Sequence, residues 1–140
     1  MPISYSPITL SASATLDRDV HANGPVVNLS SASGLTVTLP ASAGSGDVYR
    51  FYVATSVTSS VAKIAAASTD IIQGALGVTT NASGVVIPTS ATSDYITMDG
   101  ATTGGLKGSY IELRDVASGV WNVTGSILST GAEATPFAAT

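Results

Sequence analysis

The chain has 140 residues, with five basic and nine acidic side chains and a formal net charge of −4. This balance leaves no basic surface to neutralise a phosphate backbone, which argues against a nucleic-acid partner. No cysteine is present, so disulfides, thiolate zinc sites and thiol nucleophiles are excluded. Only 10% of the residues are charged, and 20 serines and 18 threonines supply most of the groups that bind water.

The sequence predicts neither a secretion signal nor a membrane partner. Residues 1–6 lack the charged region and the apolar run of a signal peptide. Serine, threonine or glycine interrupts the apolar residues every few positions, so we expect no transmembrane helix, which needs about 18 consecutive apolar residues.

Alternation of apolar and polar residues at a period of two is the dominant pattern. The N-terminal part predicts two strands, at residues 14–20 and 25–30, on either side of Asn23 and Gly24. An Asn-Gly pair supplies the positive φ angles of a tight turn, so we expect an antiparallel hairpin here. Leucine and valine then alternate with threonine over residues 35–39, which is typical of a half-buried strand.

The strand predicted at residues 47–54 is the best candidate for the middle of a sheet. Tyr49, Phe51 and Val53 share one face, and a half-polar set that includes Arg50 and Tyr52 shares the other. Shorter strands follow, separated by clusters of small polar residues. They are expected at residues 61–66, 71–74, 85–88 and 95–98.

A second hairpin is predicted in the C-terminal part, where the alternating residues 110–114 and the strand 120–127 flank a turn at 117–119. Helical periodicity is nearly absent. Strands at intervals of about 8 to 12 residues favour an all-β fold, a single-domain antiparallel β-sandwich or barrel with extended terminal arms. The expected boundaries are an N-terminal arm at 1–13, a β-domain at 14–127 and a C-terminal arm at 128–140.

Each predicted arm carries one aromatic residue close to a proline. Tyr5 is near Pro7, and Phe137 follows Pro136. Two interpretations remain open at this stage. The arms are frayed termini, as is common at domain ends, or their aromatic residues dock on a neighbouring subunit, since a lone aromatic beside proline loses little conformational entropy on binding.

The titratable residues do not form a recognisable catalytic pattern. His21 is the only histidine and lies beside a predicted turn, near Asp17 and Asp19, which are expected on one face of a strand. Since no Gly-x-Ser-x-Gly nucleophile motif occurs, a solvated turn residue is a better interpretation of His21 than a catalytic base. A carboxylate pair of the kind found in glycosidases is not excluded, but ion pairs on a strand surface explain the scattered charges better. We therefore predict no enzymatic activity, no cofactor and no metal site.

Three tyrosines are candidates for a binding surface. Tyr52, Tyr95 and Tyr110 fall on the faces opposite the aliphatic residues of their strands, where they could stack on sugars or pack on another protein. Burial of both sheet faces is the alternative interpretation. Trp121 is expected in the core, together with Val123.

The segment Leu-Thr-Val-Thr-Leu-Pro-Ala-Ser-Ala-Gly-Ser-Gly-Asp-Val-Tyr-Arg-Phe-Tyr-Val at residues 35–53 resembles a module of small structural proteins of tailed bacteriophages. The similarity continues at residues 57–59, 69–74, 102–113 and 120–123. It implies a virion component, and among such proteins a capsid decoration (cement) protein is the favoured role. Many of these proteins are small, β-rich trimers that sit on the capsid lattice.

This resemblance leads to specific expectations about partners. The protein would bind the major capsid protein on the capsid exterior and would associate with itself as a homotrimer. The expected capsid contacts are residues of the arms, Tyr5, Pro7, Pro136 and Phe137. The candidate subunit interface is the half-polar strand faces, Arg50, Tyr52, Tyr95, Tyr110, Glu112 and Arg114. The alternative is a receptor-binding or tail-fibre module that recognises host glycans through the three tyrosines.

Overall fold

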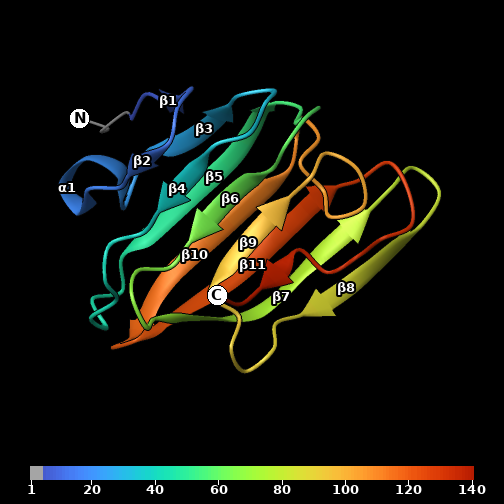
Figure 1. Cartoon of the computed structure of the whole chain (residues 1–140). Coiled ribbons are helices and arrows are strands. Elements are labelled where there is room, and N and C mark those ends of the chain that lie inside the picture. The colour runs from blue at the N-terminus through green and yellow to red at the C-terminus, as the bar shows by residue number, and fades with distance from the viewer. Residues whose placement is uncertain (1–4) are drawn as a thin grey trace.

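A computed structural model describes residues 5–140, and the protein is 49% strand and 3% helix (Figure 1). The strands form two sheets, which confirms the all-β prediction. Sheet A has seven strands in the order β1-β3-β5-β10-β11-β7-β8. They are β1 (Ile8–Leu10), β3 (Val26–Ser30), β5 (Val48–Thr55), β7 (Ile71–Thr79), β8 (Gly84–Pro88), β10 (Tyr110–Ala117) and β11 (Val120–Leu128).

Sheet B has five strands in the order β12-β9-β6-β4-β2. They are β2 (Ala14–Thr15), β4 (Thr36–Thr38), β6 (Ala62–Ala65), β9 (Tyr95–Met98) and β12 (Phe137–Ala138). The helix α1 (Arg18–His21) lies between β2 and β3 in the chain. Among residues 5–140, no helix has the length and apolar character needed to cross a membrane.

The first six strands alternate between the two sheets. The odd-numbered strands β1, β3 and β5 pair in parallel in sheet A, and the even-numbered strands β2, β4 and β6 pair in parallel in sheet B. A chain that alternates between two layers re-enters each layer in the same direction, so its successive strands run parallel. The prediction of antiparallel sheets is therefore wrong, because both sheets are mixed and five of their ten pairings are parallel.

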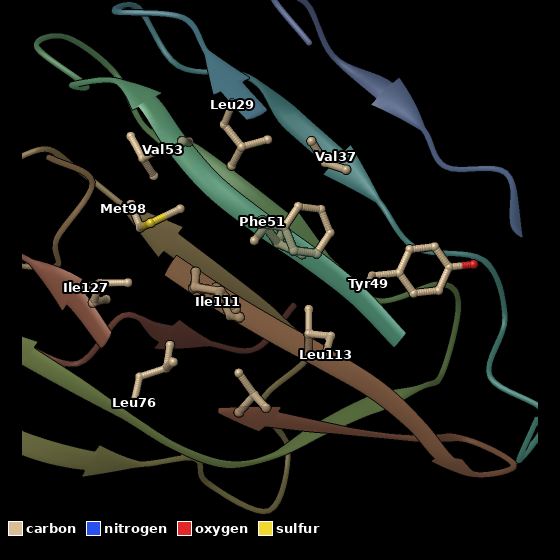
Figure 2. Close-up of a cluster of buried hydrophobic side chains, with 14 of the residues drawn as sticks. Leu29, Val37, Tyr49, Phe51, Val53, Leu76, Met98, Ile111, Leu113 and Ile127 are labelled. Atoms are coloured by element: carbon tan, nitrogen blue, oxygen red, sulfur yellow. The ribbon is translucent and has the colours of Figure 1, made fainter. Parts of the chain in front are cut away.

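One hydrophobic core joins the two sheets. Sheet A contributes Phe51, Ile111 and Leu113, and sheet B contributes Val37 and Ile96, all of them at most 1% exposed. Figure 2 shows side chains from both sheets in this cluster. The period-two alternation read from the sequence produces this core, because every second residue of a strand points to the same face.

The strand predicted at residues 47–54 is β5, and it lies inside sheet A between β3 and β10. Its core-facing residues Tyr49, Phe51 and Val53 are at most 2% exposed, as predicted. Trp121 is also buried, as predicted, and its ring meets that of Tyr49 edge to face at a centroid distance of 5.5 Å.

The hairpin predicted over residues 14–30 does not form. Only Ala14–Thr15 is strand in its first half, because Asp17 caps α1 by accepting a hydrogen bond from the Asp19 N–H at 2.8 Å. Asn23 does take a positive φ of 60°, but its side chain binds β5 rather than closing a turn. As a result β2 joins sheet B and β3 joins sheet A.

The second predicted hairpin is confirmed. Strands β10 and β11 pair antiparallel, from Tyr110 opposite Ser126 to Ala117 opposite Val120. The register shifts between Asp115 and Ala117, which marks a bulge just before the turn.

Two glycines allow the central strands of sheet A to lie close together. Gly74 in β7 and Gly125 in β11 have φ angles of 137° and 144°, which side-chain-bearing residues rarely adopt. A Cβ on Gly125 would lie 2.2 Å from the carbonyl oxygen of Tyr110, and one on Gly74 would lie 2.3 Å from that of Val123. Neither position has room for a side chain.

Candidate functional site

The outer face of strands β5 and β10 brings together five of the six predicted interface residues. Tyr52 lies opposite Tyr110 and Arg50 lies opposite Glu112 in the antiparallel register. Arg114 is exposed and the other four side chains are half-buried. We call these five residues the β5–β10 face.

The residues paired with the two tyrosines on the neighbouring strands extend this face across sheet A. Tyr52 also lies opposite Asn28 of β3, and Tyr110 also lies opposite Ser126 of β11. Asn28 and Ser126 are short and polar, so the two tyrosines are the largest side chains among these four residues. Tyrosine is enriched at protein interfaces, where its ring supplies area and its hydroxyl supplies a hydrogen bond.

The charges of the β5–β10 face largely compensate one another. Glu112 lies opposite Arg50, and its Oε1 is 3.9 Å from an Arg114 guanidinium nitrogen. An exposed ion pair of this kind stabilises the fold by about 1 kcal/mol or less. The charges therefore contribute little to stability and remain available to orient a partner.

Tyr95 lies apart from the other two tyrosines. It belongs to β9 in sheet B, and the Lys63 ammonium lies 5.1 Å from the centre of its ring. The three tyrosines therefore do not form one patch, and only Tyr52 and Tyr110 are neighbours.

A polar cluster lies where α1 meets the start of β5. Asp47 forms an ion pair with Arg18 and accepts a hydrogen bond from the Asn23 amide at 2.7 Å. Asn23 in turn accepts from the Val48 N–H at 2.9 Å. The Arg18 and Asn23 hydrogen bonds lower the pKa of Asp47 below its usual range, against the effect of burial. This carboxylate, which is 6% exposed, is therefore held ionised.

Asp115 of β10 forms a second polar contact beside this cluster. It is 3% exposed and accepts hydrogen bonds from the backbone N–H groups of Ala43 and Gly44, at 2.9 and 2.7 Å, and from the Ser45 hydroxyl at 2.9 Å. Burial on its own would raise the pKa of Asp115, but these donors outweigh it and the pKa is lowered. Asp115 thus ties the loop after β4 to the end of sheet A.

The residues considered for catalysis lie on α1 rather than on a strand. The prediction that Asp17 and Asp19 share a strand face is wrong, because Asp17 is the cap and Asp19 is in the first turn. The Asp17 N–H donates to Nδ1 of His21 at 2.9 Å, a local contact within one helical turn. Within residues 5–140, no group of three or more histidine and carboxylate side chains is arranged to hold a metal ion.

The predicted arm residues have different environments in the structure. Tyr5 is 56% exposed and Pro7 is also exposed, whereas Pro136 and Phe137 are buried. Phe137 belongs to β12, which pairs with β9, and its side chain is part of the core of its own chain. A role for Phe137 on a neighbouring subunit would require β12 to leave sheet B. Residues 1–4 lie outside the described part of the chain.

Two features were missed by the sequence analysis. The free edge of sheet A at β8 exposes Val85 and Val86, at 43% and 71%. A small cavity of about 90 Å³ lies beside the polar cluster, lined in part by Asp47, Asp115 and Trp121. The exposed valines follow from β8 being an edge strand, and the cavity depends on contacts between distant segments, so neither has a local sequence signal.

Comparisons of the chain with protein-family models, with curated proteins and with solved structures found no match.

Proposed function

We propose that the protein is a capsid decoration (cement) protein of a tailed bacteriophage. In this role it binds the major capsid protein on the outside of the capsid, stabilises the lattice and associates with itself as a homotrimer. The proposal assigns it no enzymatic activity and no nucleic-acid, membrane or cofactor partner. It rests on the sequence resemblance described above and on the character of one surface.

The observation that carries the proposal is the β5–β10 face. It places two neighbouring tyrosines and three nearly compensated charges on the regular part of a seven-stranded sheet. Such a surface suits protein contacts, because aromatic residues and arginine are enriched in interfaces. The short side chains around it lose little rotamer entropy when a neighbour covers them.

The same proposal includes the finer description of the fold. We interpret the two sheets as a β-sandwich with an N-terminal arm ahead of β1, since they share one core and no strand pairing among residues 5–140 joins an edge of one sheet to the other. The N-terminal arm is the better candidate for capsid attachment, because Tyr5 and Pro7 are exposed while Phe137 is buried.

The experiment is to mix the recombinant protein with undecorated capsids of the phage that carries it and to image the particles by electron microscopy. We expect added density on the capsid exterior. Replacing both Tyr52 and Tyr110 with serine should abolish assembly of the trimer or its binding to capsids. Tyr95→Ser is the matched control, since it removes a half-buried tyrosine from the outer face of the other sheet. Equal decoration by all three proteins would refute the assigned surface, and no decoration by the wild-type protein would refute the function.

A second candidate function is a receptor-binding or tail-fibre module that recognises host glycans. The observation that favours it is the Tyr52–Tyr110 pair, because adjacent aromatic rings on a sheet surface offer a platform for a sugar ring. Binding on a glycan array that is lost in the double serine variant, together with absence from the capsid, would favour this function over decoration.

A further inference from the structure

Strand β8 forms a free edge of sheet A. Among the described residues it pairs with β7 alone, and Figure 1 shows it at the outer side of the fold. The other sheet edges, β1, β2 and β12, have three, two and two residues, whereas β8 has five. Proteins usually protect a long edge with charged residues, a bulge or a covering segment, because its free backbone groups can pair with another strand.

Most of these protections are missing from β8. The sequence has no charged residue between Asp70 and Asp94. The pairing with β7 has no register shift along its length, so no bulge turns the edge away. All residues of β8 except Ile87 are exposed, so no other described segment covers the strand. Pro88, at the last position of the strand, is the one protective residue that β8 contains.

The hydrogen bonds at the two ends of the β7–β8 pairing show which residues of β8 bond to β7. The Thr80 N–H donates to the Ser83 carbonyl at 2.8 Å, and the Thr89 N–H donates to the Gly74 carbonyl at 2.9 Å. In an antiparallel pair, every second residue bonds to the neighbouring strand. Counted from Ser83 to Thr89, the odd-numbered residues therefore bond to β7.

The backbone groups of Gly84, Val86 and Pro88 consequently point to the free edge. They offer two N–H donors and three C=O acceptors, because proline has no N–H. The Val86 side chain lies on the outer face of the sheet, since its neighbour Val85 lies opposite the buried Val78. Such a row of unpaired backbone groups is complemented by an added β-strand.

A second copy of β8 complements this edge when the two strands run antiparallel and Val86 lies opposite Val86 of the second copy. The five strand residues then overlap completely, with Gly84 opposite Pro88 and Val85 opposite Ile87. The two Val86 residues exchange two hydrogen bonds, and the Gly84 N–H of each copy donates to the Pro88 carbonyl of the other. Each proline ring lies opposite a glycine, which has no side chain to obstruct it.

The absence of charge favours a second copy over an unrelated strand. A two-fold contact brings each group against its own copy, so a charged residue on β8 would repel itself. The uncharged stretch 71–93 removes this repulsion. Every facing pair in the fully overlapping register is apolar, and such cross-strand pairs stabilise a sheet. A shift by two residues would instead place Ile87 opposite the polar Ser83.

We propose that β8 is a self-association edge, through which two copies of the chain join their A sheets by antiparallel β8–β8 pairing about a two-fold axis at Val86. The contact is small, so it is a weak interaction that forms where copies are concentrated. Strands β11 and β7 separate β8 from the β5–β10 face, so the contact does not depend on the function proposed above. In a homotrimer held by that face, it would join two trimers.

The first experiment measures the molar mass of wild-type protein, Val86→Lys and Val20→Lys by sedimentation equilibrium over a series of concentrations. Val86 is 71% exposed, so the lysine is tolerated by the fold. Val20→Lys is the matched control, the same change at a 53% exposed valine of α1. A two-fold contact doubles whatever unit is present, so wild-type protein and control should approach twice the mass of Val86→Lys. The dissociation constant of this step should rise at least about tenfold in Val86→Lys, because like charges then face one another.

A charge-reversal pair tests whether Val86 faces its own copy. Val86→Glu alone should behave like Val86→Lys, whereas an equal mixture of the two variants should restore the doubled species, because opposite charges then meet at the axis. A mixture that keeps the mass of the separate variants would overturn the proposal. The same conclusion would follow if wild-type protein and Val86→Lys had equal masses at every concentration.

Amide hydrogen exchange locates the contact on the backbone. In the full-length ¹⁵N-labelled protein, the N–H groups of Gly84 and Val86 should exchange more slowly as the concentration rises, because they become hydrogen-bonded in the pair. The N–H of the exposed Gly131 should be unaffected. A doubled mass without protection of Gly84 and Val86 would place the contact elsewhere and refute the β8 edge. None of these readouts uses capsids, so a failure of decoration leaves them unchanged.

Discussion

Replacing Phe137 with alanine tests whether the C-terminal segment is part of the folded domain or a free arm. In the structure this side chain is 7% exposed and packs in the common core. The backbone around it is also paired, since the Thr97 N–H donates to the Pro136 carbonyl at 2.7 Å and the Asp94 N–H donates to the Ala138 carbonyl at 2.9 Å.

The expected loss of stability follows from this burial. Phenylalanine-to-alanine changes in protein cores cost about 3–5 kcal/mol. Phe137 lies in a two-residue edge strand that can relax around the missing ring, so we expect the lower end, about 3 kcal/mol. For a domain of this size that corresponds to a fall of about 10 °C in Tm.

Urea denaturation, monitored by Trp121 fluorescence, measures this loss. An unchanged m-value, the slope of the unfolding free energy against urea concentration, would show that the transition is still two-state. Tyr5→Ala is the control, because Tyr5 is the aromatic residue of the other terminus and is 56% exposed. It should change the free energy of unfolding by no more than about 0.5 kcal/mol. If the two variants are equally stable, β12 does not pack against the core as the structure has it, and the C-terminal segment is a free arm.

Two further predictions concern the loop after β4 and the close strand contacts. Asp115→Asn should cost about 2 kcal/mol at pH 7, because hydrogen bonds to a charged acceptor are among the stronger ones. The folded-state pKa of Asp115 is lowered, so its contribution is fully present above the unfolded pKa of about 3.9 and is lost as the pH falls through the folded value. The difference in urea midpoint between the wild-type protein and Asp115→Asn should therefore disappear below about pH 4. A difference that stays constant with pH would contradict this. Gly125→Ala should destabilise the fold by at least about 2 kcal/mol, because its Cβ would meet the Tyr110 carbonyl. Gly131→Ala, with nothing within 4 Å of the added carbon, should be nearly neutral. Thermal melts of both variants measure the difference, and equal melting temperatures would contradict the prediction.

The parts of the fold that the sequence predicted are those set by local chemistry. The β10–β11 hairpin needs only two alternating strands and a turn containing Gly119, which has a φ of 81°. The burial of Tyr49, Phe51 and Val53 follows from strand alternation alone. Neither prediction required knowledge of which strands become neighbours.

The parallel pairings could not be predicted in this way. Val27 of β3 lies opposite Phe51 of β5, and the strand between them in the chain, β4, belongs to the other sheet. Alternation of side chains shows which face of a strand is buried, but both sheets bury one face, so the pattern does not assign a strand to a sheet. Asn23 illustrates the consequence, since its contact with β5 replaces the hairpin that an Asn-Gly pair ordinarily favours.

The polar contacts around the loop after β4 depend even more on residues that are distant in the sequence. Residues 41–46 have the composition of an ordinary polar turn, yet buried carboxylates hold this loop through its backbone N–H groups. Asp70 accepts from Ser42 at 2.7 Å, and Asp115 accepts from Ala43 and Gly44. Three of the nine acidic residues, Asp47, Asp70 and Asp115, are at most 8% exposed. Few residues of this chain are charged, and a third of its carboxylates are nevertheless buried in or beside the loop after β4. The position of this loop is therefore set by carboxylates that are distant in the sequence, which no local pattern of residues 41–46 could reveal.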